Sequence, residues 1–190
     1  MSIFEVLSQK LSEPLQLSLL SGLISSSYFV FGNLGAAKFG VVPIILADKV
    51  KIPVLTKVGL WQEHYDIAKV SYTVHSQGQE SSLNEQKHMS LAGLVSGVSF
   101  ASAAFLSHTD AIRYAAMIAA ALSFTIGPFT LLGIFPTNNA LIKMRQASTF
   151  GPGDEADAMS LLRKWNKLNT IRMTIGFGAW LVGLAAFVAK

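Results

Sequence analysis

Two groups of aromatic and polar side chains have the spacing that brings chemically useful groups to one face of a helix. Trp61 and Tyr65 are four residues apart, so a helix would place both rings on the same side. Trp165, Asn169 and Arg172 follow one another at intervals of four and three residues, which stacks an indole, an amide and a guanidinium. Such polar groups are costly at membrane depth unless they are paired or face a cavity. They are therefore the first candidates for a binding or catalytic site.

A third group lies in the run FPTNNAL at residues 135–141, which contributes Pro136 and Asn138. Each of these residues taken alone also has a structural interpretation. Asn138 would cap a helix where the chain is interrupted, Trp165 would anchor the chain at the membrane interface, and Arg172 would extend toward lipid phosphate. A functional interpretation depends on the three groups acting together.

The four histidines offer a general base and a weaker metal alternative. His64, His75 and His88 share one segment between apolar blocks and could meet in space around a metal ion. No two histidines have the i, i+3 or i, i+4 spacing of paired ligands, and no HExxH motif occurs. Three solvated loop histidines are the plainer interpretation, so no metal is expected. His108, beside Asp110, is either a base or a helix cap.

The composition indicates a membrane protein. Of the 190 residues, 51% are hydrophobic and only 14% are charged, against about 25% charged in an ordinary soluble domain. The apolar residues gather in blocks long enough to cross a bilayer, which excludes a soluble enzyme and a disordered chain. The absence of cysteine excludes disulfides, zinc–thiolate sites, iron–sulfur clusters and thiol catalysis. The net charge of +4 fits membrane topology better than nucleic-acid binding, so no nucleic-acid partner is expected.

Four apolar blocks predict an all-α fold, an integral membrane four-helix bundle that forms one domain over residues 1–190. The spans are expected at about 15–37, 90–107, 111–135 and 171–189. The loops 46–89 and 136–170 then lie on one side of the membrane and hold most of the lysines and arginines. By the positive-inside bias both loops are cytosolic and the termini exoplasmic or lumenal. The membrane is expected to be the endoplasmic reticulum or a related endomembrane, with lumenal termini.

Shorter features add detail to this bundle. Apolar residues recur at intervals of three and four over 54–72, which predicts a helix with Lys57 on its polar surface, suited to the membrane interface. Residues 158–170 predict a second loop helix that runs into the last span. Gly93 and Gly97 form a small-residue pair that allows close helix packing, and Pro128 is expected to bend its helix.

The order of these motifs resembles the four-span membrane family of anthrone oxygenases. That family has an apolar first span followed by a Trp with a Tyr one turn later. A P-x-N-x-x-L run then follows the third span, and W-x-x-x-N/H-x-x-R leads into the last. The resemblance covers nearly the whole chain, although the loop 48–89 is longer and more polar than the family pattern leads us to expect. The matching residues are Trp61 and Tyr65, then Pro136, Asn138 and Leu141, then Trp165, Asn169 and Arg172.

The resemblance implies an oxidoreductase, a monooxygenase of aromatic polyketide biosynthesis in secondary metabolism. It would convert an anthrone to an anthraquinone, with O2 as co-substrate and without flavin, haem or metal. The implied partners are a hydrophobic aromatic small molecule and the lipid bilayer. His64 is preferred as the base, since a neutral imidazole suits proton removal near neutral pH whereas the Tyr65 phenol would need a large downward pKa shift. The candidate catalytic residues are Arg172, Asn138, Asn169 and His64, and the candidate substrate-binding residues are Trp61, Tyr65, Trp165 and Pro136.

Two other classes compete with an enzyme. One is a non-catalytic tetraspan interaction or scaffold protein, and the other is a small transporter, which the absence of mid-span ionisable residues and inverted repeats disfavours. Convergence of Asn138, Asn169 and Arg172 in a buried site would favour catalysis over scaffolding. The glycine-rich second and fourth spans leave homo-oligomerisation open.

Overall fold

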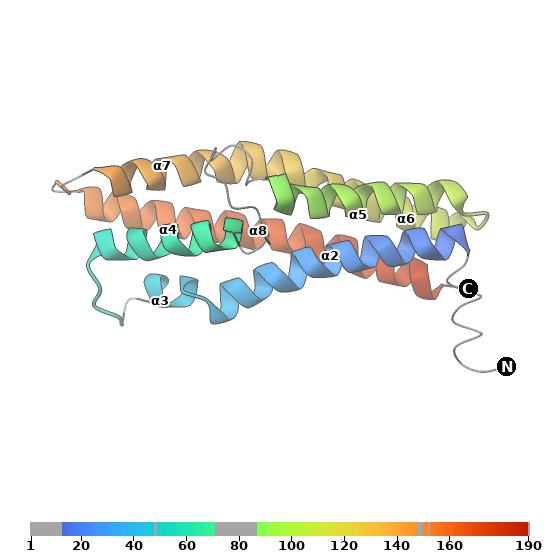
Figure 1. Ribbon diagram of the computed structural model, residues 1–190, viewed down its shortest axis with the longest axis horizontal. Helices are drawn as coiled ribbons and strands as arrows, with labels where there is room; N and C mark the ends of the chain where they lie inside the picture. The colour runs from blue at the N-terminus through green and yellow to red at the C-terminus, as the bar shows by residue number, and fades with distance from the viewer. Residues whose placement is uncertain (1–12, 48, 71–86, 148–149, 152, 190) are drawn as a thin grey trace. The chain divides into compact units, whose positions relative to one another are not determined.

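The computed structural model describes residues 13–47, 49–70, 87–147, 150–151 and 153–189, with backbone alone at 67–70 and 87–90. Every regular element among these residues is helical (Figure 1). The predicted all-α fold class with long apolar helices is therefore confirmed. In chain order the elements are α2 (Pro14–Phe39), α3 (Val42–Leu46), α4 (Val54–Val70), α5 (Lys87–Leu106), α6 (Asp110–Phe129), the π-helical turn η1 (Thr130–Ile134), α7 (Phe135–Gln146) and α8 (Asp154–Val188).

Three of the described helical stretches are long and apolar enough to cross a membrane, namely Pro14–Phe39, Asp110–Gln146 and Asp154–Val188. They contain the residues expected to form the first and third spans, and those expected to form the fourth span as far as Val188. Residues 90–106 of the expected second span lie on α5, whose described apolar part, Leu91–Leu106, is shorter. The chain is thus a membrane protein by the length and composition of its helices. The exact span boundaries, the single domain and the sidedness of the loops stay predictions.

The chain divides into two compact units. Unit 1 comprises Met1–Gly32, Met89–Pro128 and Met173–Lys190. Unit 2 comprises Asn33–His88 and Phe129–Arg172. Helices α2 and α8 contribute residues to both units, so the two units are described separately below.

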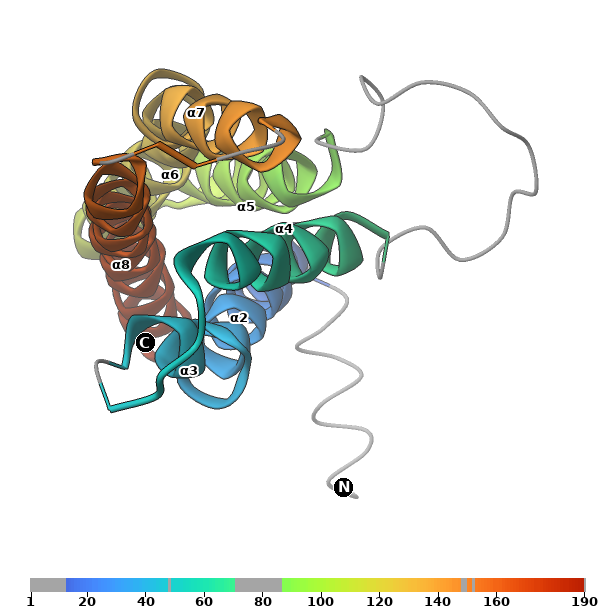
Figure 2. The same cartoon turned by 90° about the vertical axis from the view of Figure 1, so that its left-hand side faces the viewer.

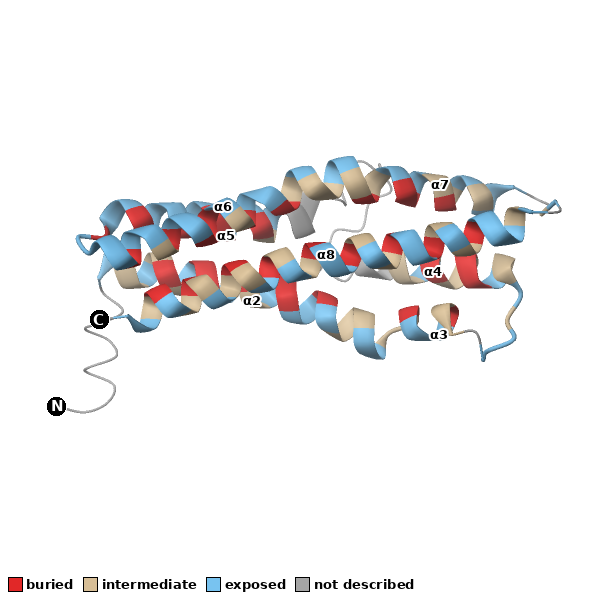
Figure 3. Ribbon diagram, turned by 180° about the vertical axis from the view of Figure 1, so that it is seen from behind, coloured by how far each residue is buried: buried red, intermediate tan, exposed pale blue. Residues whose placement is uncertain are grey.

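In unit 1 the ring of Phe100 packs against glycines of two other helices. Phe100, on α5, is fully buried. A Cβ atom placed on Gly22 of α2 would lie 2.7 Å from this ring, and one placed on Gly183 of α8 would lie closer still. Only glycine leaves room for the ring between α2 and α8. Figure 3 shows in red how the buried positions recur along these helices.

Close packing also joins α5 to α6 in unit 1. A Cβ atom on Gly97 would lie 2.8 Å from the ring of Phe124, and one on Gly93 would lie 3.7 Å from the backbone oxygen of Ser123. The buried hydroxyls of Ser96 and Ser123 share a hydrogen bond of 3.1 Å. The close helix contact predicted from Gly93 and Gly97 is therefore confirmed, and a polar pair adds to it.

The helix that begins at Asp110 continues further than the sequence indicated. It passes through Pro128, adopts one π-helical turn and proceeds as α7 to Gln146. Pro136 cannot donate a hydrogen bond to the carbonyl four residues earlier, and the wider π-helical turn before it accommodates its ring. The expectation that a loop begins at Pro136 is therefore wrong at the level of backbone conformation, because residues 136–146 are helical.

The packing around Phe100 predicts that replacing different glycines by alanine lowers the stability of the protein by different amounts. Gly183→Ala or Gly22→Ala forces a methyl group into a fully buried ring, so we expect a loss of about 1–3 kcal/mol. Thermal unfolding of the detergent-solubilised protein, followed by circular dichroism, measures this change. Gly35→Ala is the matched control, because a Cβ atom there meets no atom within 4 Å. Equal losses at Gly35 and Gly183 would contradict the packing argument.

Candidate functional site: a buried arginine beside an aromatic cluster

Helix α4 buries the face that the apolar pattern predicted. Val58 and Trp61 have no exposed surface, and Tyr65, one turn later, is partly buried. Figure 2 shows α4 between α3 and α7, and it contacts both of them. The helix predicted over 54–72 is confirmed over 54–70 as α4, and its last two residues lie outside the described part of the chain. The surface position expected for Lys57 is wrong, because α4 packs against helices on two sides and Lys57 is only 6% exposed.

Three aromatic side chains from α4 and α8 meet in unit 2. The Trp61 and Tyr65 rings are stacked, with centroids 5.3 Å apart and an interplanar angle of 7°. The Trp165 ring meets Trp61 edge to face, with centroids 5.9 Å apart and an angle of 81°. Two of the sequence motifs, more than one hundred residues apart in the chain, therefore form one aromatic cluster. We call these three residues the aromatic cluster.

Arg172 lies in a buried polar group formed by α2 and α8. Its Nη2 donates to Oδ1 of Asn33 at 2.9 Å and to Oδ1 of Asn169 at 2.7 Å. All three side chains are buried. Asn169 follows Trp165 of the aromatic cluster by one turn of α8, which puts the polar group next to the cluster. The two amide oxygens orient the guanidinium through charge-assisted hydrogen bonds.

Asn33 is the member of this group that the sequence analysis missed. It lies in the apolar run 15–37, which was interpreted only as a membrane span. An amide deep in an apolar helix is costly unless it is paired, so its presence there was a usable signal. Its partner Arg172 lies 139 positions away in the chain, and no local pattern could identify that pairing.

Helix α7 presents Asn138 to the interior and Pro136 to the exterior. Asn138 is 2% exposed. Ile134 and Leu141, on the same helix face, pack in one apolar core with Trp61 and Trp165 of the aromatic cluster. Pro136 is exposed on α7. The structure thus places Asn138 on the buried side with the aromatic cluster and does not place Pro136 there.

Several buried polar atoms near the aromatic cluster lack hydrogen-bond partners among the described residues. They are Nε1 of Trp61, Nε1 of Trp165, Oδ1 of Asn138 and Oε1 of Gln62. Folded proteins satisfy most of their buried polar groups, and each exception costs about 1–3 kcal/mol. Two donors and two acceptors left unsatisfied in one unit are therefore a signal of function.

Of the three histidines predicted as possible metal ligands, only His64 has a side chain that the structure describes. It lies on α4 directly before Tyr65 and is partly buried. Burial lowers the pKa of the His64 imidazole from its usual 6.5, so the ring is neutral at pH 7. His75 and the side chain of His88 lie outside the described residues. Among the described residues no group of three metal-ligating side chains occurs, and the metal alternative stays a prediction.

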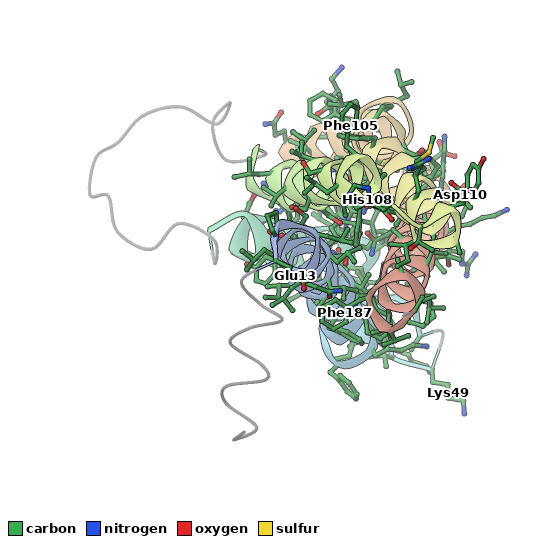
Figure 4. The ribbon with its side chains drawn as sticks, turned by 90° about the vertical axis from the view of Figure 1, so that its right-hand side faces the viewer. Glu13, Lys49, Phe105, His108, Asp110 and Phe187 are labelled. Atoms are coloured by element: carbon green, nitrogen blue, oxygen red, sulfur yellow. The ribbon has the colours of Figure 1, made fainter. Side chains whose placement is uncertain are left out.

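A surface groove of about 650 Å³ lies between α5 and α6 and belongs to unit 1. Alanines and two phenylalanines, Phe105 and Phe124, line it, with Arg113 at one side. It contains none of the predicted site residues. His108, in the turn between α5 and α6, is exposed (Figure 4), and the hydrogen bonds of that turn come from Ser107, whose Oγ accepts from the backbone N–H of Thr109 at 3.2 Å.

The fold and the buried group define a helical membrane protein with an internal polar and aromatic site. A family model for anthrone oxygenase matches residues 82–182, more than half of the chain. The chain therefore belongs to the anthrone oxygenase family, as the order of its motifs predicted. Neither the curated proteins nor the solved structures contain a match. The matched segment holds Asn138, Trp165, Asn169 and Arg172, whereas Asn33, Trp61, His64 and Tyr65 precede it.

The polar group predicts a stability cost for removing Asn33. Asn33→Leu keeps the side-chain size but deletes an acceptor of a buried cation, so we expect a loss of about 1.5–3 kcal/mol. Thermal unfolding in detergent measures it, with Asn139→Leu on the exposed side of α7 as the control. An unchanged melting temperature for the Asn33 variant would show that the bond to Arg172 contributes nothing.

Proposed function

We propose that this protein is a membrane-embedded oxygenase that converts an anthrone-type aromatic polyketide to an anthraquinone with O2. Membership of the anthrone oxygenase family supports an oxygenase role. The observation that carries the proposal is the Arg172 guanidinium, buried with Asn169 on α8, where Asn169 follows Trp165 of the aromatic cluster by one helical turn. Such a site joins a cation to flat apolar surfaces, the combination that an oxygenated polycyclic substrate requires.

The proposed chemistry needs little assistance beyond a base and a cation. One anthrone and one O2 give one anthraquinone and one water. A base removes a proton from the methylene carbon between the two aromatic rings, and the resulting anion transfers an electron to O2. Recombination forms a carbon–oxygen bond, and the peroxide anion takes the first proton back from the base to give a hydroperoxide at that carbon. The base then removes the second proton from the carbon while the O–O bond breaks, which leaves the ketone, and the departing hydroxide takes that proton to form water.

The buried polar residues would act on the oxyanion. Removal of the proton places negative charge on the substrate oxygen, and Arg172 would stabilise that charge at short range in a site shielded from water. Asn169 and Asn138 would supply amide hydrogen bonds to this oxygen and to neighbouring phenols. The aromatic cluster would hold the ring system. The burial of Asn138, Asn169 and Arg172 in unit 2 supports catalysis over the scaffold alternative.

His64 is the proposed general base. A base must be unprotonated to accept the proton, and burial keeps the His64 imidazole neutral at pH 7. Its position between Trp61 and Tyr65 on α4 puts it beside the proposed substrate surface. Tyr65 is the second choice.

The setting of the reaction forms part of the same proposal. The substrate would partition from the bilayer, the membrane would be the endoplasmic reticulum or a related endomembrane, and the two longer loops would be cytosolic. No flavin, haem or metal takes part in the proposed steps. Nucleic acid is not a proposed partner, and homo-oligomerisation is left open.

Turnover of a defined substrate tests the proposed function. The purified protein in detergent receives a dihydroxyanthrone, and oxygen uptake and quinone absorbance are followed together, with spontaneous autoxidation subtracted. We expect protein-dependent quinone formation at one O2 per quinone, unchanged by a chelator. Chelator-sensitive turnover would instead assign a metal to His64, His75 and His88. No acceleration over autoxidation for several anthrones would refute the proposed substrate class.

Replacement of Arg172 tests the proposed stabilisation of the oxyanion most directly. Arg172→Ala is expected to lower kcat at least about 100-fold, the loss typical of one oxyanion donor, while Arg172→Lys retains the charge and loses less. The anthrone assay measures both, and circular dichroism confirms that the proteins are folded. Lys167→Ala removes an exposed charge from the same helix and should leave the rate unchanged. Full activity of a folded Arg172→Ala protein would eliminate its catalytic role.

The pH dependence tests the base. Because the pKa of His64 is lowered below 6.5, kcat/KM should be constant above about pH 7 and fall about tenfold per pH unit below the His64 pKa. His64→Gln should be slow and should lose this acidic limb. His108→Gln changes an exposed histidine and should keep the profile. An acidic limb that persists in active His64→Gln protein would assign the base to another group.

A further inference from the structure

The three tryptophans of this protein differ in one respect. Trp180 in unit 1 donates its indole N–H to Oγ of Ser27 at 2.7 Å. Trp61 and Trp165 in unit 2 bury their indole N–H groups without a hydrogen-bond acceptor among the described residues. Their side chains are 0% and 7% exposed, so bulk solvent does not reach these N–H groups. The difference is confined to the two indoles of the aromatic cluster.

Packing between the two indoles leaves at least one N–H unsatisfied. Trp61 and Trp165 meet edge to face at 81°. In such a pair the edge of one ring points at the face of the other, so at most one of the two N–H groups can make an N–H/π contact. Tyr65 stacks on Trp61 at 7°, and that face contact satisfies no N–H group. Aromatic packing alone therefore does not explain why at least one indole N–H group of this pair is buried without an acceptor.

An acceptor is also unsatisfied on the neighbouring helix. Oδ1 of Asn138 is buried and has no hydrogen-bond donor among the described residues. Asn138 shares its face of α7 with Leu141, which packs in the same apolar core as Trp61 and Trp165. The site therefore offers two N–H donors and one carbonyl acceptor within one apolar core. A ligand that satisfies all of them needs an acceptor oxygen and a hydroxyl group.

We propose that the indole N–H groups of Trp61 and Trp165 are hydrogen-bond donors to an oxygen of the bound aromatic molecule, and that Oδ1 of Asn138 accepts from its hydroxyl. The ligand class is a hydroxylated aromatic ketone or the corresponding phenolate. The inference deepens the proposed function, on which it rests for the aromatic nature of the ligand. The two indoles then select oxygenated rings over hydrocarbon rings of the same shape.

Binding must open the aromatic cluster. The N–H groups of both indoles and Oδ1 of Asn138 are shielded from solvent in this structure, so a ligand oxygen reaches them only when neighbouring side chains move, and the movement we propose is separation of the Trp61 and Trp165 rings. Their edge contact contributes about 0.5–1.5 kcal/mol, which contacts to a flat ligand replace. The ligand thus exchanges one aromatic contact for another and gains the hydrogen bonds.

Equilibrium binding of a stable ligand pair tests this inference without turnover. The full-length protein in detergent is titrated with a dihydroxyanthraquinone and, separately, with anthracene, which has the ring shape but no oxygen. Trp61 or Trp165 is replaced by β-(3-benzothienyl)alanine, which keeps the bicyclic ring and removes the N–H. The same replacement at Trp180 is the matched control. Ratios of Kd between variant and parent protein cancel the partitioning of each ligand into detergent.

We expect the replacement at Trp61 or Trp165 to weaken dihydroxyanthraquinone binding about 5- to 10-fold, the worth of one hydrogen bond, and to leave anthracene binding unchanged. The Trp180 replacement should change neither Kd. An unchanged Kd for dihydroxyanthraquinone, or equal weakening for both ligands, would overturn the inference. No binding of dihydroxyanthraquinone by the parent protein would overturn it as well.

A second measurement needs no variant. The indole N–H proton resonances of the three tryptophans report directly on hydrogen bonding. Dihydroxyanthraquinone should shift those of Trp61 and Trp165 downfield and leave that of Trp180 in place, whereas three unmoved resonances would overturn the inference.

Failure of this inference and failure of the proposed function give different results. Indole-dependent binding without anthrone turnover would refute the proposed function alone. Turnover that is indifferent to both indole N–H groups would refute this inference alone.

Discussion

Burial of a guanidinium carries a large desolvation cost in unit 2, and much of the site depends on how that cost is met. Removing a cation from water costs several kcal/mol unless hydrogen bonds replace its hydration. Asn33 from α2 and Asn169 from α8 both accept from Nη2 of Arg172, at 2.9 and 2.7 Å. The two helices are therefore tied at one point by a charged group. A cation held by neutral amides retains its attraction for an anionic oxygen, which is why the same interaction serves both stability and the proposed chemistry.

The rest of unit 2 surrounds this point with apolar surface. The stacked pair Trp61 and Tyr65 and the edge of Trp165 exclude water, and a charge in such surroundings interacts more strongly than at an aqueous surface. In unit 1 the close contacts come from glycine and small polar residues instead. Phe100 fits between helices only because Gly22 and Gly183 lack side chains, a packing mode suited to helices in lipid, where apolar burial alone does not join them.

Local periodicity explains what the sequence could predict. Intervals of three and four residues predicted helix α4 and the shared face of Trp61 and Tyr65, because helical geometry depends only on neighbours in the chain. Contacts between distant segments were not predictable. Nothing in the sequence paired Asn33 with Arg172, buried Lys57, or indicated that helix continues through Pro136 after a π-helical turn. These features depend on which helices pack together, and a π-helical turn has no reliable sequence signature. The indole N–H groups that lack an acceptor among the described residues likewise became visible only from the positions of those residues.

A structure of the full-length protein with a bound dihydroxyanthraquinone, determined in a lipid nanodisc, tests the central claim most directly. The account predicts that the ligand lies in unit 2, with one oxygen within hydrogen-bond distance of the Arg172 guanidinium and its rings against Trp61, Tyr65 and Trp165. A ligand bound instead in the groove between α5 and α6, with Arg172 still held only by protein groups, would contradict it.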